Sequence, residues 1–586
     1  MKEGAIVGID LGTTNSVAAI VENGRPRIIS DTGGGYLIPS VVAIDEKGNR
    51  LVGQAAKRQT LINPIHTVHG AKRLIGRDIR SNVVDDIQEH FKYRITETEG
   101  SDVQIQLRED AYGLDEISAM ILDHVRNVAQ DMLGREITKA VVTVPAYFND
   151  RQRQAVRDAG KIAQLEVLRI INEPTAAALA YGFAKGFKQK LAIYDFGGGT
   201  FDVSILDVRG NVFEVKATGG DTFLGGVDFD NRLAEWVMHH FEKEHGIDLS
   251  RDPMSHQRIT DACEQAKIDL SIRTETRINI PYITAGPEGP INLDMAIKRE
   301  EFEELTHDLV DNTLKSCQRV MDDCKLRPED IDAVLLVGGS TRIPIVARSV
   351  EKFFGKSPSK AIHPDEAVAL GAALLADSLA GKSEEQVVLL DVLPITIGLH
   401  GAGGKTIPIF ERNTSIPNQK MKAFTTSRDN QKSLKLKLLQ GDSIEAKDNE
   451  IIGELVFSGI RPAPKGKAKV EVLFNISQEG ILSLSARDSD TGLEQESQLK
   501  IENDRHKVRH PELITPKKPV EKKEAEKLIT RTVTKEVKLK AATAPPPSQD
   551  TRKPEAAAKP PPKPVIKHEP WMSRFIKNLK RSLGIK

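Results

Sequence analysis

A strand–turn–strand pattern built on acids and glycines occurs twice in this chain and constrains its fold more than any other feature. Residues 191–205, LAIYDFGGGTFDVSI, place three glycines and a threonine between two apolar runs, with Asp195 and Asp202 on the two sides of the turn. Residues 5–18, AIVGIDLGTTNSVA, repeat the arrangement with Asp10 before a Gly/Thr turn. Copies about 185 residues apart predict a duplicated α/β unit whose two hairpins face one nucleotide from opposite sides.

The composition of these turns indicates phosphate binding. Consecutive glycines cost chain entropy, so they suit a place where the backbone must come close to another group. A concave run of backbone amides binds phosphate oxygens, and the neighbouring acids become favourable if Mg²⁺ lies between them and the phosphates. The alternative is a plain hairpin with a flexible tip. The repetition argues against it, as does a third glycine turn after the apolar run in LLVGGSTRIP at 335–344.

The first two thirds of the chain have α/β organisation. Short apolar strands alternate there with amphipathic helices up to about residue 383. We expect a strand over 140–148 and a helix over 151–165. We also expect a strand that passes into a helix over 169–183, and a helix over 261–271.

A second unit follows a short connection. Residues 384–391, EEQVVLLD, are acidic and then apolar. From 392 to about 503 the apolar residues alternate with period two and no long helix is visible, which predicts an all-β unit of about 110 residues.

The last part of the chain has a different composition. From residue 504 on it carries 22 Lys/Arg against 9 Asp/Glu, so its net charge is near +13 and that of the rest is near −13. Residues 504–568 are rich in Pro, Lys and Ala, which predicts disorder. Residues 569–586 predict a basic amphipathic helix. Three interpretations of that helix stay open: reversible attachment to an anionic membrane surface, packing back on the β unit, or binding of RNA.

Composition also bounds the location and the class of partner. A net acidic body argues against a general nucleic-acid binder. Cys263, Cys317 and Cys324 have no metal-ligand spacing, and so sparse a set indicates a reducing compartment. We see no signal peptide and no apolar span of 18 residues. We therefore expect a cytoplasmic location, at the inner face of the membrane if residues 569–586 attach there.

Several motifs closely resemble those of the DnaK-type 70-kDa heat-shock chaperones. They are GIDLGTTNS, AKRLIG, VTVPAYFND, INEPTAAALAYG, DFGGGTFDVSI, GGSTRIP, HPDEAVALGAA and the linker VVLLDVLP. The resemblance runs continuously and in order over about residues 4–503. It implies an actin-like ATPase domain of two ribonuclease-H-like lobes over 1–383, a linker over 384–391 and a peptide-binding β-sandwich over 392–503. The last 80 or so residues lack the length and patterning of the family's helical lid, so we expect the lid to be missing.

The resemblance assigns roles around ATP. The two hairpins would clamp its β- and γ-phosphates through Gly12, Thr13, Thr14, Gly197, Gly198, Gly199 and Thr200. Asp10 and Asp195 would hold Mg²⁺ through its water shell. Lys72 would be catalytic together with Glu173, Asp202 and Thr200. Without the resemblance, Lys72 reads as a surface helix lysine and Glu173 as an acid at a helix start.

The purine side follows in the same way. Spacings of three, four and seven put Glu264, Lys267 and Ser271 on one helix face, which by itself suggests a surface ion pair. The resemblance implies that this face lines the adenine and ribose. It also implies that Gly339 lies close to the nucleotide, that Arg342 stacks over the base and that Asp365 lies near the phosphates. His363 stands where the family usually has Asn. We expect little effect of His363 on binding. The implied cofactors are ATP/ADP, Mg²⁺ and K⁺.

The resemblance also assigns the peptide groove and its coupling to ATP. The groove positions are Leu399, Phe424, Leu434, Leu436, Val470 and Val472, with Ala402 and Ser427 arching over the peptide. Alternation alone would place the apolar ones in the core. Ala402 is smaller than usual, so the arch should hold peptide less tightly. The linker, Val387, Val388, Leu389, Leu390 and Asp391, would dock on the ATPase domain with ATP, although Gln386 replaces its usual leading Asp. Pro145 and Arg153 would relay the nucleotide state.

The implied function is that of an ATP-dependent chaperone that captures and releases extended apolar segments of unfolded or nascent polypeptides. Implied partners are a GrpE-type nucleotide exchange factor and a J-domain co-chaperone, which would dock on Tyr147, Asn149, Asp150, Arg169, Asn172 and Thr175. A sugar or small-metabolite kinase shares the ATPase architecture, but the linker and the sandwich argue against it. A scaffold for one dedicated client, of the kind that assists iron–sulphur cluster assembly, stays open.

Overall fold

The computed structural model describes residues 5–498 apart from short gaps. The gaps are residues 32, 78, 80–83, 85–87, 89–90, 99–101, 184–185, 187, 288, 382–385, 490 and 493. The predictions made for residues 504–568 and 569–586, and for the missing lid, lie outside the described residues.

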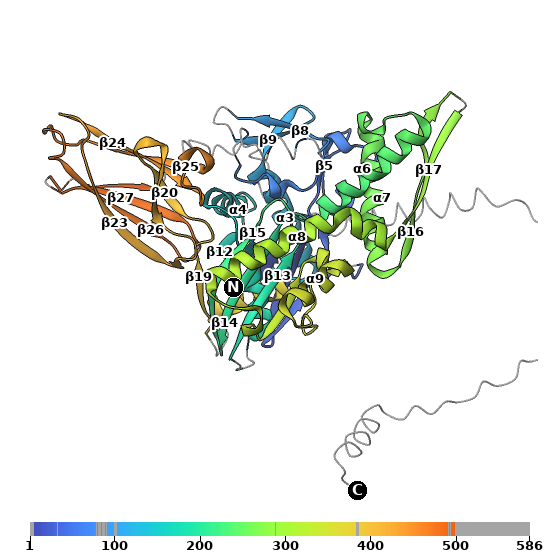
Figure 1. Ribbon diagram of the computed structural model, residues 1–586, viewed down its shortest axis with the longest axis horizontal. Coiled ribbons are helices and arrows are strands. Elements are labelled where there is room, and N and C mark those ends of the chain that lie inside the picture. The colour runs from blue at the N-terminus through green and yellow to red at the C-terminus, as the bar shows by residue number, and fades with distance from the viewer. Residues whose placement is uncertain are drawn as a thin grey trace, which may run out of the picture. The chain divides into compact units, whose positions relative to one another are not determined.

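The first repeat of the glycine pattern forms the centre of a six-stranded sheet (Figure 1). Its strands are β1 (Ala5–Asp10), β2 (Asn15–Glu22), β3 (Arg25–Ile28), β4 (Ile38–Pro39), β11 (Ile137–Val144) and β12 (Glu166–Asn172). The order is β12-β11-β1-β2-β3, and β4 pairs with β2. Strand β1 runs parallel to β11 and antiparallel to β2, so Asp10 ends the strand at the turn.

The second repeat builds a second six-stranded sheet with the same pairing. Its strands are β13 (Lys188–Phe196), β14 (Phe201–Arg209), β15 (Val212–Asp221), β18 (Ala333–Val337), β19 (Val388–Val392) and β22 (Ser415–Ile416). Strand β13 runs parallel to β18 and antiparallel to β14, as β1 does to β11 and β2. The matching pattern confirms two lobes of duplicated α/β topology.

Two helices lie between the sheets and join the lobes. Helix α5 (Glu173–Gly182) packs on β13 and β14, and α10 (Ala367–Leu379) packs on β1 and β2. The helices also pack on each other, and a Cβ on Gly371 would lie 1.8 Å from the Ala176 carbonyl oxygen. Because only glycine allows this approach, α10 fixes the spacing of the two lobes.

The remaining helices and small sheets cover the outer faces. In the first lobe these are α1 (Gln54–Lys57), α3 (Leu114–Leu133), α4 (Asp150–Ile162), and the small sheets of β5 (Val42–Ile44), β6 (Arg50–Val52), β7 (Thr67–Val68) and β8 (Arg94–Glu97), β9 (Val103–Leu107), β10 (Asp110–Gly113). In the second lobe they are α6 (Gly226–His245), α7 (Pro253–Ile272), α8 (Arg299–Cys324), α9 (Pro344–Phe354) and the hairpin of β16 (Glu275–Gly286) and β17 (Gly289–Lys298). Cys263 lies on α7, and Cys317 and Cys324 lie on α8.

The all-β unit consists of two four-stranded antiparallel sheets that share one core. One sheet contains β20 (Ile397–His400), β21 (Thr406–Phe410), β24 (Ser433–Gln440) and β25 (Glu450–Ser458). The other contains β23 (Asn418–Thr425), β26 (Lys469–Ile476), β27 (Leu482–Asp488) and β28 (Glu494–Gln498). Two lobes of duplicated α/β topology followed by a β-sandwich are therefore the fold of the described chain.

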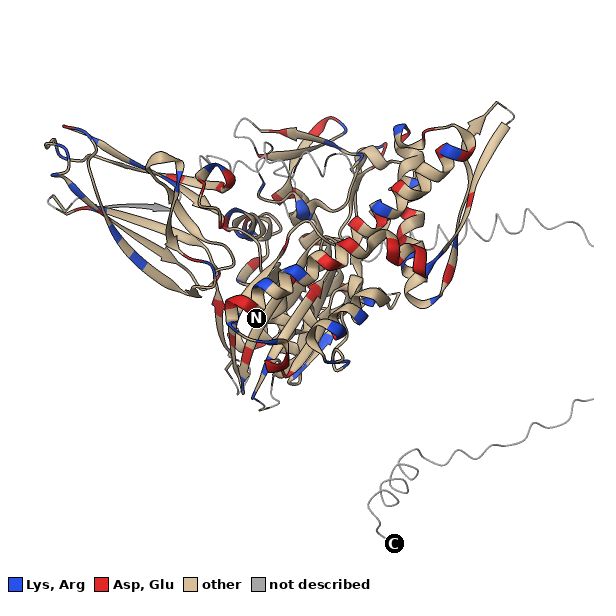
Figure 2. Ribbon diagram, viewed as in Figure 1, with Lys and Arg blue, Asp and Glu red and all other residues tan. Residues whose placement is uncertain are grey.

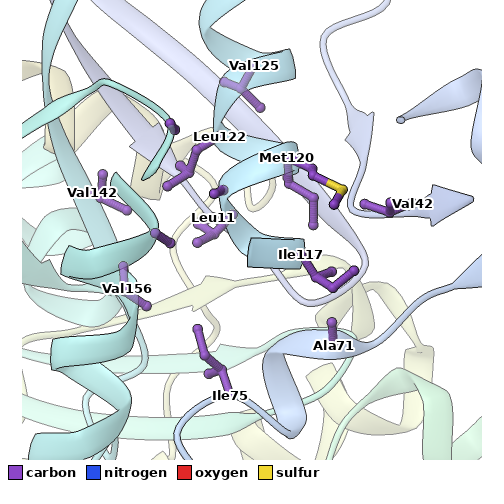
Figure 3. Close-up of a cluster of buried hydrophobic side chains, with 14 of the residues drawn as sticks. Leu11, Val42, Ala71, Ile75, Ile117, Met120, Leu122, Val125, Val142 and Val156 are labelled. Atoms are coloured by element: carbon purple, nitrogen blue, oxygen red, sulfur yellow. The ribbon is translucent and has the colours of Figure 1, made fainter. Parts of the chain in front are cut away.

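The short turn that carries Lys72 is held by the core of the first lobe. Figure 3 shows Ala71, the first residue of this turn, next to Ile117 of α3, and Ile75, which follows the turn, in the same cluster of buried apolar side chains. The 3₁₀ turn Ala71–Arg73 is buried as a whole. Apolar neighbours on both sides thus anchor the backbone and fix where the lysine side chain emerges.

Two predicted boundaries were wrong. The strand expected over 140–148 begins at Ile137 and ends at Val144, because Pro145 cannot donate a ladder hydrogen bond. The helix expected over 151–165 runs from Asp150 to Ile162, with the Asn149 side chain accepting from the Gln152 N–H as its N-cap. Among the described helices, none combines the length and the apolar character needed to cross a membrane.

Candidate functional site

The two predicted hairpin turns face each other directly. A Cβ on Gly198 would lie 2.0 Å from Thr14 Oγ1, and one on Gly199 would lie 2.4 Å from Thr13 Cγ2. Side chains at these two positions would collide with the other turn. The glycines therefore permit the close approach of backbone from both lobes, which is the arrangement that the duplicated pattern predicts.

The third glycine turn joins the second. Ser340 Oγ donates to the Gly197 carbonyl oxygen at 2.7 Å. The first residues of α6 also reach this turn, because the Gly226 and Val227 N–H groups donate to the carbonyl oxygens of Gly197 and Gly198 at 3.0 and 2.9 Å. All three turns therefore converge. In the first turn, the Gly12 carbonyl oxygen accepts from Ser40 Oγ at 2.8 Å.

Four carboxylates and one lysine gather beside the turns. Lys72 Nζ lies 2.6 Å from Glu173 Oε1, and both side chains are buried. Asp195 stands directly opposite Asp202 in the register of β13 and β14. Asp10 accepts from Thr143 Oγ1 at 2.9 Å, at the end of the corresponding strand of the first lobe. The interpretation of Lys72 as a surface lysine is therefore wrong.

The electrostatics of this cluster favour a bound cation. Burial is the main cause that raises the pKa of Asp10 to about 7 and that of Asp202 to about 8, and the Glu173 carboxylate adds to both. Burial and the same carboxylate hold the pKa of Asp195 well above its usual value. Asp195 Oδ2 has no hydrogen-bond partner among the described residues. Excess negative charge and an unpartnered carboxylate oxygen fit Mg²⁺.

The cluster is not a direct metal cage. Among the described residues, no three His, Cys, Asp or Glu side chains converge closely enough to hold a metal ion between them. An ion at Asp10 and Asp195 would complete its coordination with water and phosphate oxygens, which is how Mg²⁺ usually binds with nucleotides. A water-mediated role for both residues stays a prediction.

The predicted purine-side residues lie together on α7, but their ion pairs reach other elements. Lys267 Nζ lies 2.7 Å from Asp230 Oδ2 and 2.9 Å from the Gly226 carbonyl oxygen. Glu264 instead pairs with Lys57 of the first lobe at 3.1 Å. Burial would raise the pKa of Glu264, but Lys57 and Lys267 outweigh it and lower that pKa. Among the described residues, Glu264 and Lys267 therefore form their ion pairs with other partners and not with each other. Ser271 Oγ donates to the Lys267 carbonyl oxygen at 3.0 Å.

Arg342 lies at the edge of the third turn. Its guanidinium donates to Asp365 Oδ2 at 2.5 Å and lies 3.2 Å from His363 Nε2. A Cβ on Gly339 would meet Asp365 Oδ1 at 3.5 Å. These four residues thus form one group in which Arg342 and His363 are exposed. Of the predicted residues on α7, Lys267 reaches the glycine turns through its hydrogen bond to Gly226, whose N–H donates to Gly197.

The linker forms a strand of the second lobe. Residues Val388 to Leu390 of β19 pair in parallel with β15. Val387 and Leu389 pack against the core between the lobes, whereas Val388 and Leu390 are exposed. Asp391 accepts from Asn172 Nδ2 at 2.8 Å and from Thr175 Oγ1 at 3.2 Å.

The predicted relay residues lie between the nucleotide cluster and the linker. Arg153 is buried and donates to the carbonyl oxygens of Phe148 and Ala146 at 3.0 and 2.9 Å. These carbonyls follow Pro145 and precede Asn149, and the Tyr147 N–H between them donates to Asp202 at 3.1 Å. A continuous chain of contacts therefore connects Asp202 to Arg153.

The predicted co-chaperone surface is covered in this conformation. Asn149 Nδ2 donates to Glu450 at 2.9 Å, and Asp150 Oδ1 accepts from the Leu482 N–H at 2.8 Å. Asn172 and Thr175 bond to Asp391, as described, and Arg169 donates to Gln478. Because these side chains serve contacts with the sandwich and linker, they do not form an open docking face here.

The predicted groove residues divide into three groups. Leu399, Val470 and Val472 are at most 4% exposed and belong to the sandwich core. Phe424, Leu434 and Leu436 are partly exposed and pack against that core. Ala402 and Ser427 are exposed. Only the middle group offers apolar surface in this conformation, so the groove roles of the core residues stay predictions.

Several residues of the site were missed from the sequence. Arg73 is buried, donates to the Gly199 carbonyl oxygen at 3.0 Å and pairs with Asp228 of the other lobe. Lys57 and Asp230 were missed as partners of Glu264 and Lys267. Each of these residues pairs with a partner that is distant in the sequence, so local spacing does not reveal the pair. Only Arg73 could have been suspected from the sequence, because it follows Lys72 directly.

A comparison with protein families agrees with this geometry. The model of a family described as Hsp70 protein matches residues 6–560 of the chain. The match includes every predicted site residue and extends beyond residue 503, where the resemblance was expected to end.

Proposed function

We propose, from the premise that this chain belongs to the Hsp70 family, that ATP binding and hydrolysis control its capture and release of extended apolar segments in unfolded proteins. Members of the family are chaperones and ATPases that bind ATP or ADP with Mg²⁺ and unfolded polypeptides. The observation that carries the proposal is the convergence of the glycine turns on the cluster of Lys72, Glu173, Asp10, Asp195 and Asp202.

Each residue of the cluster has a chemical task in phosphoryl transfer to water. The facing amides of the two turns bind phosphate oxygens and orient the γ-phosphoryl group. The Lys72 ammonium offsets negative charge that develops on that group. Glu173, which lies 2.6 Å from Lys72 Nζ, and Asp202 orient or polarise the attacking water. Mg²⁺, when bound near Asp10 and Asp195, neutralises phosphate charge.

Control of the groove would run through the linker strand. The contacts from Asp202 through the 145–153 segment reach Arg153, and Asp391 binds Asn172 at the start of α5. A strand that pairs with β15 in one nucleotide state and separates in the other has two discrete arrangements. Such an element couples two sites because each ligand favours one arrangement.

A permanently unfolded client tests this proposal. The full chain should bind a reduced and alkylated protein in ADP and release it when Mg·ATP is added, as measured by fluorescence anisotropy. A peptide rich in leucine should compete with it. Binding that is insensitive to both nucleotide and peptide would contradict the proposal, and capture of one client only would support the dedicated-client scaffold.

The finer partners remain proposals. A J-domain co-chaperone would act on the face around Arg169 when the sandwich moves away, a GrpE-type factor would exchange nucleotide, and K⁺ would accompany Mg²⁺. A cytoplasmic location with membrane attachment through residues 569–586 predicts co-sedimentation of the chain with anionic vesicles. Deletion of those residues should abolish it, and a lack of pelleting at low salt would contradict it.

A further inference from the structure

One end of the β-sandwich is strongly basic although the body of the chain is acidic. The segments 427–437 and 459–469 together contain eight Lys or Arg and one acid, Asp429. The chain up to residue 503 has a net charge near −13. Figure 2 shows Lys and Arg on the loops at this end of the sandwich. So local an excess of positive charge needs an explanation beyond average composition.

Backbone hydrogen bonds join the two segments into one surface. The Gly466 N–H donates to the Thr426 carbonyl oxygen at 2.9 Å, and the Asn430 N–H donates to that of Ala463 at 2.9 Å. The N–H groups of Gly459 and Ile460 both donate to the Lys432 carbonyl oxygen, at 3.0 and 3.1 Å. The loops are therefore held side by side, and their cations share one rim.

Most of this charge is not neutralised within the described part of the chain. Lys435 lies 3.8 Å from Glu454, and Lys469 lies 3.2 Å from Glu471. Five other exposed side chains form no ion pair with any described residue. They are Arg428, Lys432, Lys437, Lys465 and Lys467. Asp429, the one acid of the two segments, uses its Oδ1 to accept a hydrogen bond from the Lys465 backbone N–H at 2.7 Å. We call the five unpaired cations Arg428, Lys432, Lys437, Lys465 and Lys467 the basic rim.

The basic rim borders the partly exposed apolar residues of the sandwich. Arg428 follows Ser427 and lies four positions after Phe424 at the end of β23. Lys432, directly before β24, and Lys437, within it, flank Leu434 and Leu436 in the sequence. A chain segment seated on those apolar side chains would pass within reach of the rim, because long Lys and Arg side chains extend several ångströms from the backbone.

We propose that this chain selects apolar client segments that are flanked by acidic residues. The inference rests on the proposed function and adds the charge of the client to it. Aspartate or glutamate beside a Leu-rich segment would meet unpaired cations, whereas lysine or arginine there would be repelled. The chain's own tail, with a net charge near +13, is a poor occupant for the same reason.

Two labelled peptides test this on the full chain with ADP. Both have the same leucine-rich core, flanked by glutamates in one and by lysines in the other. At about 50 mM salt the glutamate peptide should bind roughly tenfold more tightly, and the ratio should fall to about twofold near 0.5 M salt because salt screens exposed charges. Fluorescence anisotropy gives both dissociation constants.

A charge-reversed variant assigns the preference to the rim. K465E/K467E should lose most of the ratio between the peptides, while K315E/K352E, with the same change of charge on exposed helix lysines of the ATPase lobes, should keep it. Equal, salt-independent binding of both peptides would overturn the inference and leave the proposed function intact. Binding of neither peptide would overturn the groove itself, and a preference unchanged in K465E/K467E would overturn the role of the rim.

Discussion

The nucleotide cluster and the client end of the sandwich use charge in opposite ways. The cluster buries Asp195, Asp202, Glu173 and Lys72 between two lobes, so its acids cost free energy until a cation arrives. The basic rim leaves its cations in water beside half-buried apolar side chains. The nucleotide cluster therefore requires a ligand and cation in one geometry. The basic rim tolerates many client sequences and only shifts the affinity towards acidic ones. This difference predicts sharp effects at the cluster and graded effects at the sandwich.

The largest effect should follow the loss of the lysine in the cluster. K72A should lower the steady-state rate of ATP hydrolysis by about 10²- to 10³-fold, because one buried positive charge at the transferring phosphoryl group is removed. Nucleotide binding should persist, since the glycine turns remain. K139A, at a partly exposed strand lysine that pairs with Glu166 at 3.5 Å, is the control. Hydrolysis by K72A within threefold of the native rate would contradict the catalytic role.

Adjacent linker leucines give a matched test of coupling. L389S removes a side chain packed between the lobes, and L390S removes one that is 42% exposed. With ATP, proteolysis of the linker in L389S should be roughly tenfold faster than in the native chain, because a polar side chain disfavours docking. L390S should differ little. Equal cleavage of both variants would show that linker packing does not hold the strand.

Apolar contact in the groove should have a smaller effect. F424A should weaken binding of a leucine-rich peptide by roughly tenfold through lost apolar area. Met421 lies on the same strand and is 63% exposed, so M421A should leave the affinity for the peptide unchanged. Anisotropy titrations at one salt concentration compare the two, with unfolding temperatures to verify the fold. A stronger effect of M421A would place the groove elsewhere.

The buried acids predict a distinct pH dependence of stability. With its pKa near 8, folded Asp202 keeps a proton that the unfolded chain loses above about pH 4, so stability falls as pH rises from about 4 to 8. D202N cannot ionise and should unfold roughly 2–5 °C above the native chain at pH 8 without nucleotide. The difference should shrink towards pH 5. Parallel melting curves at both pH values would contradict the raised pKa.

The smallest change concerns the arch. A402M should slow peptide dissociation about twofold to threefold by adding apolar contact over the groove, as stopped-flow displacement would show. Faster dissociation than in the native chain would mean that residue 402 obstructs the peptide rather than covering it.

The sequence predicted the parts of this molecule that depend on local pattern. The repeated glycine turns predicted two α/β units whose hairpins face each other, and period-two alternation predicted the sandwich. Pairs such as Lys57 with Glu264 and Arg73 with Asp228 could not be found, because burial brings together residues that no spacing connects. Lys72 and Glu173 were assigned only through the family resemblance. Phe424 and Leu434 look like core residues by alternation, since an apolar groove and an apolar core use the same residues.

The central claim is that the nucleotide cluster controls the groove through the linker strand. The most direct test is the dissociation rate of a labelled leucine-rich peptide from the full chain, measured after mixing with Mg·ATP or Mg·ADP. The account predicts release many-fold faster with ATP. Equal rates with the two nucleotides would show that the cluster and the groove are not coupled, and would contradict the claim.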